Sequence, residues 1–282
     1  MKHINLNLRL FMTVMAMALF ITGCSDNESV DNTPEEQQLD QSEVARSAEI
    51  DRASDSLDDI AISVYEIQEQ SEQNRSAANF QLPECVTVTV VMEQNYREIT
   101  IDFGTEGCLV HGNLLKGKII LTYERDPEAQ EVFITKTFED FYFNVKNIQG
   151  GKTILKQLSN ENGNPQFTKT SDITVVWPNG AQASRGGVKV REWIEGFGSG
   201  VFSDNVFEIT GNWSTTFVNG NTHTYTVVIP LRREVICFYF VSGSIDVERT
   251  NFSGVFDYGE GDCDNMATFT FDSGEVIDIV LN

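Results

Sequence analysis

The chain has 282 residues, a formal net charge of −22 and an apolar content of 40%. Such a length and composition suffice for a sizeable buried core. A negative field of this strength repels phosphate backbones, which excludes nucleic acid as an expected partner.

The first 24 residues differ from the rest of the chain. Lys2 and Arg9 precede an apolar run, residues 10–21. This run is too short to cross a bilayer comfortably. The run ends in ITGC, which resembles the lipobox of bacterial lipoproteins. This resemblance implies cleavage before Cys24 and a lipid, such as palmitate, on Cys24 that attaches the chain to a membrane. The alternative is an ordinary secretory signal peptide over 1–24 with a chance cysteine.

An acidic segment follows the lipobox. SDNE, residues 25–28, is similar to the surface-export signal of Bacteroidota-type lipoproteins. This similarity implies an outer-membrane lipoprotein exposed on the cell surface, and a periplasm-facing anchor is the alternative. Residues 25–40 are polar and acidic, which predicts a disordered tether.

Residues 41–72 show the periodicity of one amphipathic helix. The apolar positions recur every three or four residues, and they are Ile50, Ala53, Leu57, Ile60, Val64 and Ile67. Four aspartates, Asp51, Asp55, Asp58 and Asp59, lie off this stripe. The pattern predicts a helix that lies on the edge or face of the domain that follows, within a monomer. A short coiled coil between chains is the alternative, although it usually needs three or more heptads.

Residues 83–282 predict an all-β domain. About a dozen runs, such as CVTVTV, KIILTY and MATFTF, alternate with a period of two and are separated by turn signals. The short connections favour an antiparallel meander, closed into a barrel or folded into a sandwich. Asn219-Gly220 is the clearest hairpin signal and predicts a type I′ turn.

Two similar loops carry a further resemblance. DFGTEGC (102–108) and DYGEGDC (257–263) both read Asp, aromatic residue, Gly, three residues, Cys. Together with REWIEG and EITGNWSTTFVNG, they resemble an uncharacterised family of Bacteroidota-type lipoproteins across most of the β domain. The resemblance implies no catalytic residue.

No motif in the sequence predicts catalysis. The histidines beyond the signal, His111 and His223, belong to no HExxH motif, and the chain has no GxSxG elbow. We therefore expect no enzyme and no hydrolytic site, an expectation that a Ser, His and acid within hydrogen-bond reach would contradict. The three tryptophans favour core packing over sugar stacking.

The second loop also offers oxygen ligands. Asp257, Glu260, Asp262 and Asp264 place four carboxylates among glycines, which suits calcium. The first loop keeps only Asp102 and Glu106, whereas both loops keep the cysteine. No cofactor is therefore expected, and calcium at these four residues is the alternative.

Four cysteines remain after Cys24, and they allow three pairings. The midpoint between Cys237 and Cys263 falls at a predicted turn near residue 250, and that between Cys85 and Cys108 falls at one near residue 96. Each pair would thus face across the open end of its own hairpin, within disulfide reach. Exported chains meet oxidising conditions, so two disulfides are predicted. The alternative is four buried free thiols.

These patterns favour a lipid-anchored, non-catalytic envelope protein that acts as a binding, adhesion or scaffold module for an unknown protein or glycan. One alternative is a carrier of small apolar ligands in a β-barrel, which would leave an apolar cavity of several hundred Å³, about the size of known ligand sites. A surface enzyme acting on carbohydrate or peptide is the other.

Overall fold

The computed structural model describes residues 41–72, 81–249 and 253–281. The predicted signal peptide, the predicted tether and Cys24 lie outside the described residues. The described residues belong to one compact unit, residues 37–282, so the helix and the sheet share a unit.

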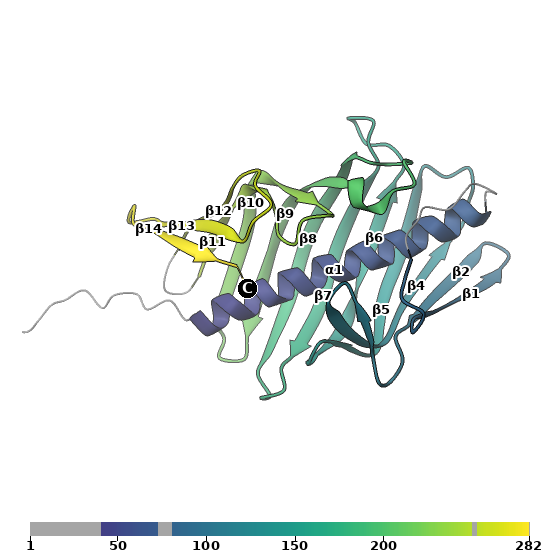
Figure 1. Cartoon of the computed structure of the whole chain (residues 1–282), viewed down its shortest axis with the longest axis horizontal. Helices are drawn as coiled ribbons and strands as arrows, with labels where there is room; N and C mark the ends of the chain where they lie inside the picture. Colours follow the sequence, from purple (N-terminus) through teal and green to yellow (C-terminus); the bar gives the residue numbers. More distant parts are fainter. Residues whose placement is uncertain (1–40, 73–80, 250–252, 282) are drawn as a thin grey trace, which may run out of the picture. The chain divides into compact units, whose positions relative to one another are not determined.

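The fold is one helix followed by an antiparallel β-meander (Figure 1). Helix α1 spans Gln41–Glu72 and confirms the predicted helix. A short 3₁₀ helix, η1 (Phe202–Asp204), precedes β9. The strands are β1 (Thr87–Glu93), β2 (Tyr96–Asp102), β3 (Cys108–Val110), β4 (Asn113–Glu124), β5 (Glu131–Phe143), β6 (Lys146–Gln157), β7 (Gln166–Val176), β8 (Gln182–Glu195), β9 (Val206–Phe217), β10 (Thr222–Glu234), β11 (Ser242–Glu248), β12 (Ser253–Glu260), β13 (Met266–Phe271) and β14 (Val276–Val280).

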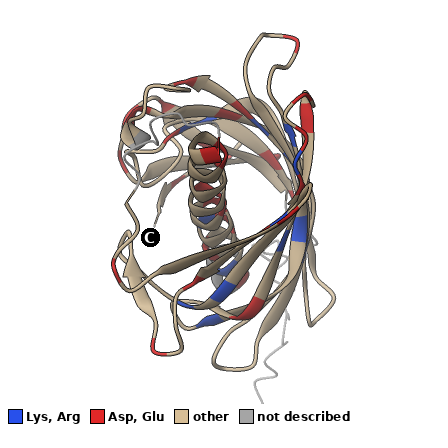
Figure 2. Cartoon of the chain, turned by 90° about the vertical axis from the view of Figure 1, so that its right-hand side faces the viewer, with Lys and Arg blue, Asp and Glu red and all other residues tan. Residues whose placement is uncertain are grey.

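The sheet is open. Strands pair in sequence order from β1 to β14, except that the short β3 pairs only with β4. Among the described strands β1 and β14 form the two ends of this path, so the meander is confirmed and the barrel closure does not form. Instead the sheet curves around α1, which lies along its inner side (Figure 2).

The apolar stripe of α1 is buried against this inner side. Ile50, Leu57, Ile60 and Val64 belong to one core cluster with residues of β2 and β4 to β9. The helix therefore packs on its own domain, as predicted, and its stripe is covered within the chain. A second, smaller core lies among β9 to β13, around residues such as Trp213 and Phe269.

One turn prediction was wrong in type. The hairpin at Asn219-Gly220 forms, but only Gly220 has a positive φ, 88°, and its N–H donates to the carbonyl of Phe217. This is a type I turn with a glycine at its end, because a four-residue connection favours that geometry. Two consecutive positive φ angles, as a type I′ turn requires, occur instead at His111 (46°) and Gly112 (79°) between β3 and β4.

Candidate functional site

The inner face of the sheet carries a row of cations beside its apolar residues. In β6, Lys152, Ile154 and Lys156 alternate with outward-facing residues and are all buried. Lys136 of β5 stands directly opposite Lys152. Like charges in opposite positions are destabilising unless an anion lies between them. The sheet therefore requires negative charge on the element that covers it.

Helix α1 supplies that charge at its centre. The Asp58 carboxylate accepts hydrogen bonds from Lys136 Nζ, from Lys152 Nζ at 3.1 Å and from Lys169 Nζ at 2.7 Å. Burial raises the pKa of Asp58, but the three lysine charges outweigh it and hold that pKa well below its usual value. Burial lowers the pKa of Lys152 to about 8; the nearby charge of Asp58 raises this pKa, and that of Lys136 lowers it.

Similar pairs continue along the helix in both directions. We call the whole set the charge ladder. Its further pairs are Glu49–Lys146, Asp51–Arg185, Asp51–Lys189, Asp55–Lys189, Asp59–Arg191, Asp59–Arg233, Glu66–Lys156, Glu69–Arg125, Glu72–Arg125 and Glu72–Arg97. In Figure 2 acidic residues mark the helix and basic residues mark the strands around it.

The charge ladder places several helix acids away from solvent. Of the aspartates that lie off the apolar stripe, Asp55, Asp58 and Asp59 are buried. A buried ion pair offsets its own desolvation only in part, and removal of one partner leaves an uncompensated buried charge. The ladder therefore disfavours placements of α1 in which these charges lose their partners.

A Ser, His and acid do lie within hydrogen-bond reach of one another. His223 Nδ1 is 3.4 Å from Ser47 Oγ, and His223 Nε2 is 3.0 Å from Glu43 Oε2. By distance alone, this trio is the arrangement that would contradict the expectation of no hydrolytic site. However, Glu43, Ser47 and His223 expose only 4%, 2% and 3% of their surfaces.

The surroundings of the trio indicate a structural role. Glu43 also accepts hydrogen bonds from the side-chain amides of Asn219 and Asn221 in the β9–β10 turn. The His223 ring packs against Phe217 at 4.8 Å between centroids. A nucleophile must reach a substrate carbonyl and an oxyanion site, whereas Ser47 is enclosed between α1 and β10. The trio therefore attaches the start of α1 to the sheet.

The two DxGxxxC loops share one local structure. In each, the Asp side chain accepts a hydrogen bond from the N–H two residues later: Asp102 from Gly104 at 2.8 Å and Asp257 from Gly259 at 2.7 Å. Both glycines have positive φ, 74° and 89°. The aspartate thus stabilises a bend that glycine adopts without steric cost.

Both predicted disulfides are present. Cys85–Cys108 and Cys237–Cys263 have Cα–Cα distances of 5.7 and 5.5 Å. Each bond joins a buried cysteine, Cys108 or Cys237, to an exposed one. The repeated loop therefore bends the chain so that its cysteine reaches the opposite end of the hairpin.

The calcium candidates do not converge. Asp257 is engaged in the bend just described, and Asp264 Oδ1 accepts the N–H of Met266 at 2.9 Å. Across residues 41–72, 81–249 and 253–281, no group of three or more His, Cys, Asp or Glu side chains is arranged to hold a metal ion. The four carboxylates Asp257, Glu260, Asp262 and Asp264 thus form no metal-ligating group.

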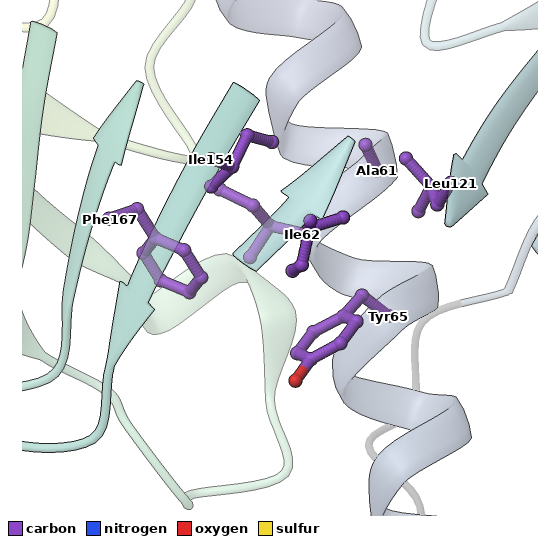
Figure 3. A pocket seen from close by; sticks show the side chains of 7 residues that line it. Ala61, Ile62, Tyr65, Leu121, Ile154 and Phe167 are labelled. Atoms are coloured by element: carbon purple, nitrogen blue, oxygen red, sulfur yellow. The ribbon is translucent and has the colours of Figure 1, made fainter. Parts of the chain in front are cut away.

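The interface between α1 and the sheet is densely filled. Figure 3 shows the side chains of Ile62 and Tyr65 on the side of Ile154 and Phe167 of the sheet, and Ala61 beside Leu121. The cavity between them has about 10 Å³, and a second one near Ile50 has the same volume. Each holds at most about one water molecule. Trp177, Trp193 and Trp213 are also buried, as the core interpretation expected.

A larger pocket lies at one side of the helix. It has about 270 Å³ and is lined by residues from α1, from the β3–β4 turn, from η1 and from the segment between β10 and β11. No single stretch of sequence predicted it, because its lining comes from four segments that are distant along the chain.

Comparisons with protein-family models, with curated proteins and with solved structures return no match to this chain. In the part of the chain that the structure describes, no helix is both long enough and apolar enough to cross a membrane.

Proposed function

We propose that this protein is a non-catalytic lipoprotein of the cell envelope whose β unit is a binding, adhesion or scaffold module. The lipobox-like ITGC supports a lipid on Cys24, and the acidic SDNE supports an outer-membrane, surface-exposed location. The resemblance to a Bacteroidota-type lipoprotein family belongs to the same proposal.

The observation that carries the binding role is the filled inner face of the sheet. Its cations are neutralised by α1, and the two cavities between the apolar side chains of the helix and of the sheet have about 10 Å³ each. An apolar carrier needs an interior cavity of several hundred Å³. The filled interior therefore favours a module that binds a protein or glycan with its outer surface or loops.

The same packing argues against a surface hydrolase. Ser47, His223 and Glu43 are enclosed, and their hydrogen bonds hold α1 to the sheet. We expect Ser47→Ala to leave any hydrolysis of ester or peptide substrates at the level of the unchanged protein. A hydrolytic activity that Ser47→Ala abolishes in a folded protein would establish the enzyme alternative instead.

Fractionation tests the lipid anchor. We expect Cys24→Ala to move the protein from the membrane fraction to the soluble fraction, while the neighbouring control Ser25→Ala stays with membranes. If Cys24→Ala protein still sediments with membranes after a salt wash, the lipoprotein proposal is wrong. Protease treatment of intact cells then separates the surface-exposed location from the periplasm-facing one.

Two screens test the binding role. Native mass spectrometry of protein purified from the envelope should detect a monomer with a retained partner, and a glycan array should identify a carbohydrate partner. A protein that carries a fatty acid or another small apolar molecule in stoichiometric amount would favour the carrier alternative.

A further inference from the structure

Strand β1 lies at one end of the sheet (Figure 1). Among the strands that the structure describes, β1 pairs with β2 alone, so its other side offers backbone groups to a further strand. We propose that this edge binds an extended segment of a partner protein, which adds to the sheet as a further antiparallel strand. This inference rests on the proposed function, because it assigns a site and a class of partner to the binding module.

The backbone of β1 defines the chemistry of the ligand. Glu93 and Tyr96 are partners on either side of a two-residue turn, which makes them a hydrogen-bonded pair. Such pairs alternate along an antiparallel ladder, so the N–H and C=O groups of Val88, Val90 and Met92 point away from β2. Alternating donors and acceptors at this spacing match the main chain of another extended polypeptide.

The same three residues form an apolar row that the protein covers only in part. The row continues the inner face of the sheet, since Val90 stands opposite the buried Ile99 and packs against the main core. Val88 and Met92 nevertheless expose 41% and 58% of their surfaces. Side chains directly opposite each other share one face, so a partner strand with an apolar residue at every second position would extend this row.

β1 also lacks the features that protect sheet edges from pairing. Charged side chains, proline, bulges and short length are the usual protection. Residues 87–92 include no charge and no proline, and the seven residues of β1 pair with β2 without a register shift. At the other end of the sheet, β14 has five residues with Asp278 at its centre. Of these two edges, β1 is therefore the better suited to accept a strand.

The charge of the chain indicates which segment would bind. A net charge of −22 attracts cationic segments and repels a second copy of the same chain. On the outer face of the hairpin, Val91 stands opposite Glu98, and Glu93 follows two residues later. We therefore assign to the partner a segment that alternates apolar residues, on the inner face, with lysine or arginine on the outer face.

Titration of the detergent-solubilised full chain with synthetic peptides tests the proposal. The first peptide has the length of β1, seven residues, and alternates valine with lysine. We expect saturable binding, and at least tenfold weaker binding of a peptide with glutamate in place of lysine. No saturation by roughly 5 mM peptide, above a weak millimolar affinity, overturns the proposal. Equal affinity of the glutamate peptide overturns the cationic assignment.

Backbone methylation of the peptide distinguishes strand addition from charge attraction alone. Valines that stand opposite Val88, Val90 and Met92 direct their N–H groups at β1, whereas the lysines direct theirs away. Methylation of the valine nitrogens should therefore weaken binding at least tenfold, and methylation of the lysine nitrogens should change it less than threefold. Equal effects of the two methylated peptides overturn strand addition.

Two matched variants locate the binding. Met92→Lys places a charge in the apolar row and should weaken binding of the valine–lysine peptide at least tenfold. Met266→Lys adds the same charge on β13, at a residue that is similarly exposed, and should leave binding nearly unchanged. Equal loss in both variants, or no loss in Met92→Lys, overturns the site.

Val88→Pro keeps the test decisive if Met92→Lys does not fold. Proline at this position removes an N–H that points away from β2, so the β1–β2 ladder keeps its bonds. Binding should again weaken at least tenfold, and unchanged binding overturns the site.

Hydrogen exchange and sedimentation decide what occupies the edge. The amides of Val88, Val90 and Met92 should exchange rapidly in the free protein and become protected when the peptide saturates it. Protection in the free protein would show that the edge is already covered and overturns the proposal. A dimer that Met92→Lys dissociates would identify a second copy as the occupant and overturns the assignment to another protein.

Failure of this site is distinguishable from failure of the proposed function. If the peptides do not bind but envelope-purified protein retains a partner, the edge assignment is wrong and the binding role stands. If neither the mass-spectrometric nor the glycan screen finds a partner, the binding role itself is contradicted.

Discussion

Two regions of the sheet bury different kinds of side chain. One region is the set of strands around α1, and the other is the C-terminal strands β11 to β14. Around α1, lysines and arginines of β5 to β8 are buried and paired with helix acids such as Asp58. In β11 to β14, the small core is apolar, with Ile245, Val247 and Phe269 buried, and partly buried rings surround it: the Phe256 and Phe269 rings lie 6.5 Å apart, and the rings of Phe269 and Phe271 4.9 Å apart. A covalent bond, Cys237–Cys263, reinforces it.

This difference follows from what each region can bury. A 32-residue helix offers long side chains on every side, so charges can be matched as well as covered. Short strands such as β13 and β14 cannot cover a buried cation on both sides. In this C-terminal region a disulfide adds stability instead, because it restricts the conformations of the unfolded chain. One region thus depends on electrostatic matching and the other on a covalent link.

The largest expected effect comes from breaking the match at its centre. Asp58→Asn keeps the shape but leaves Lys136, Lys152 and Lys169 buried without their counter-charge. Loss of one partner from a buried pair typically costs about 3–5 kcal/mol of unfolding free energy. Denaturation in urea should show this loss.

A matched control is an ion pair of the same kind that lies at the surface. Glu139 pairs with Lys118 on the sheet, and both side chains are substantially exposed. Glu139→Gln should leave the urea midpoint unchanged within error, because exposed pairs contribute little. If Asp58→Asn is equally neutral, the charge ladder does not hold the helix.

The next effect tests the covalent link. Replacing Cys237 and Cys263 together with Ala should lower the unfolding free energy by about 3–4 kcal/mol in the chain-entropy model. The pair Cys85 and Cys108 closes a loop of similar size, 23 against 26 residues, and should lose a similar amount. Melting of the two double variants under matched conditions measures both.

In the variant without Cys237 and Cys263, the loss of stability should be confined to one region of the sheet. Hydrogen exchange should show local opening of β11 to β14 in the variant without Cys237 and Cys263, whereas β5 to β8 stay protected. Uniform loss of protection across the sheet would contradict the division into two regions.

A smaller effect is a dependence of stability on alkaline pH. Burial lowers the pKa of Lys152 to about 8 from a value near 10.5 in the unfolded chain. Between these values the unfolded chain binds more protons, so stability should rise by about 1–3 kcal/mol from pH 8 toward pH 10. Urea denaturation across this range measures the rise.

Above about pH 10 the sign should reverse. Burial raises the pKa of Tyr65 and of Tyr123, so these phenols ionise first in the unfolded chain and favour it. Lys152→Met should reduce the rise below pH 10 while leaving the fall above it. A Lys152→Met protein with the full rise would assign it to other groups.

Part of this fold can be predicted from the sequence, for identifiable reasons. The helix follows from its three- and four-residue spacing, and the disulfides follow from the balance of each cysteine pair about a turn. The charge ladder does not follow, because Asp58 meets lysines 78 to 111 residues away only after the sheet has curved around α1. One signal was available: Lys152 and Lys156 share a strand face with Ile154, which is buried. The pocket offered no such signal, since its arginines lie far apart in the sequence.

The smallest expected effect concerns the repeated loop. Asp257 accepts the N–H of Gly259, as Asp102 accepts that of Gly104. Asparagine has the same acceptor oxygen without the charge, so Asp257→Asn should leave the melting temperature unchanged. Asp257→Ala removes the acceptor and should cost about 1 kcal/mol, the typical net contribution of one hydrogen bond. The same two changes at Asp102 should give the same pattern. Calcium should shift the melting temperature of none of these proteins, because the aspartate shapes a bend; a calcium-dependent stabilisation that Asp257→Asn abolishes would show that this loop binds the ion.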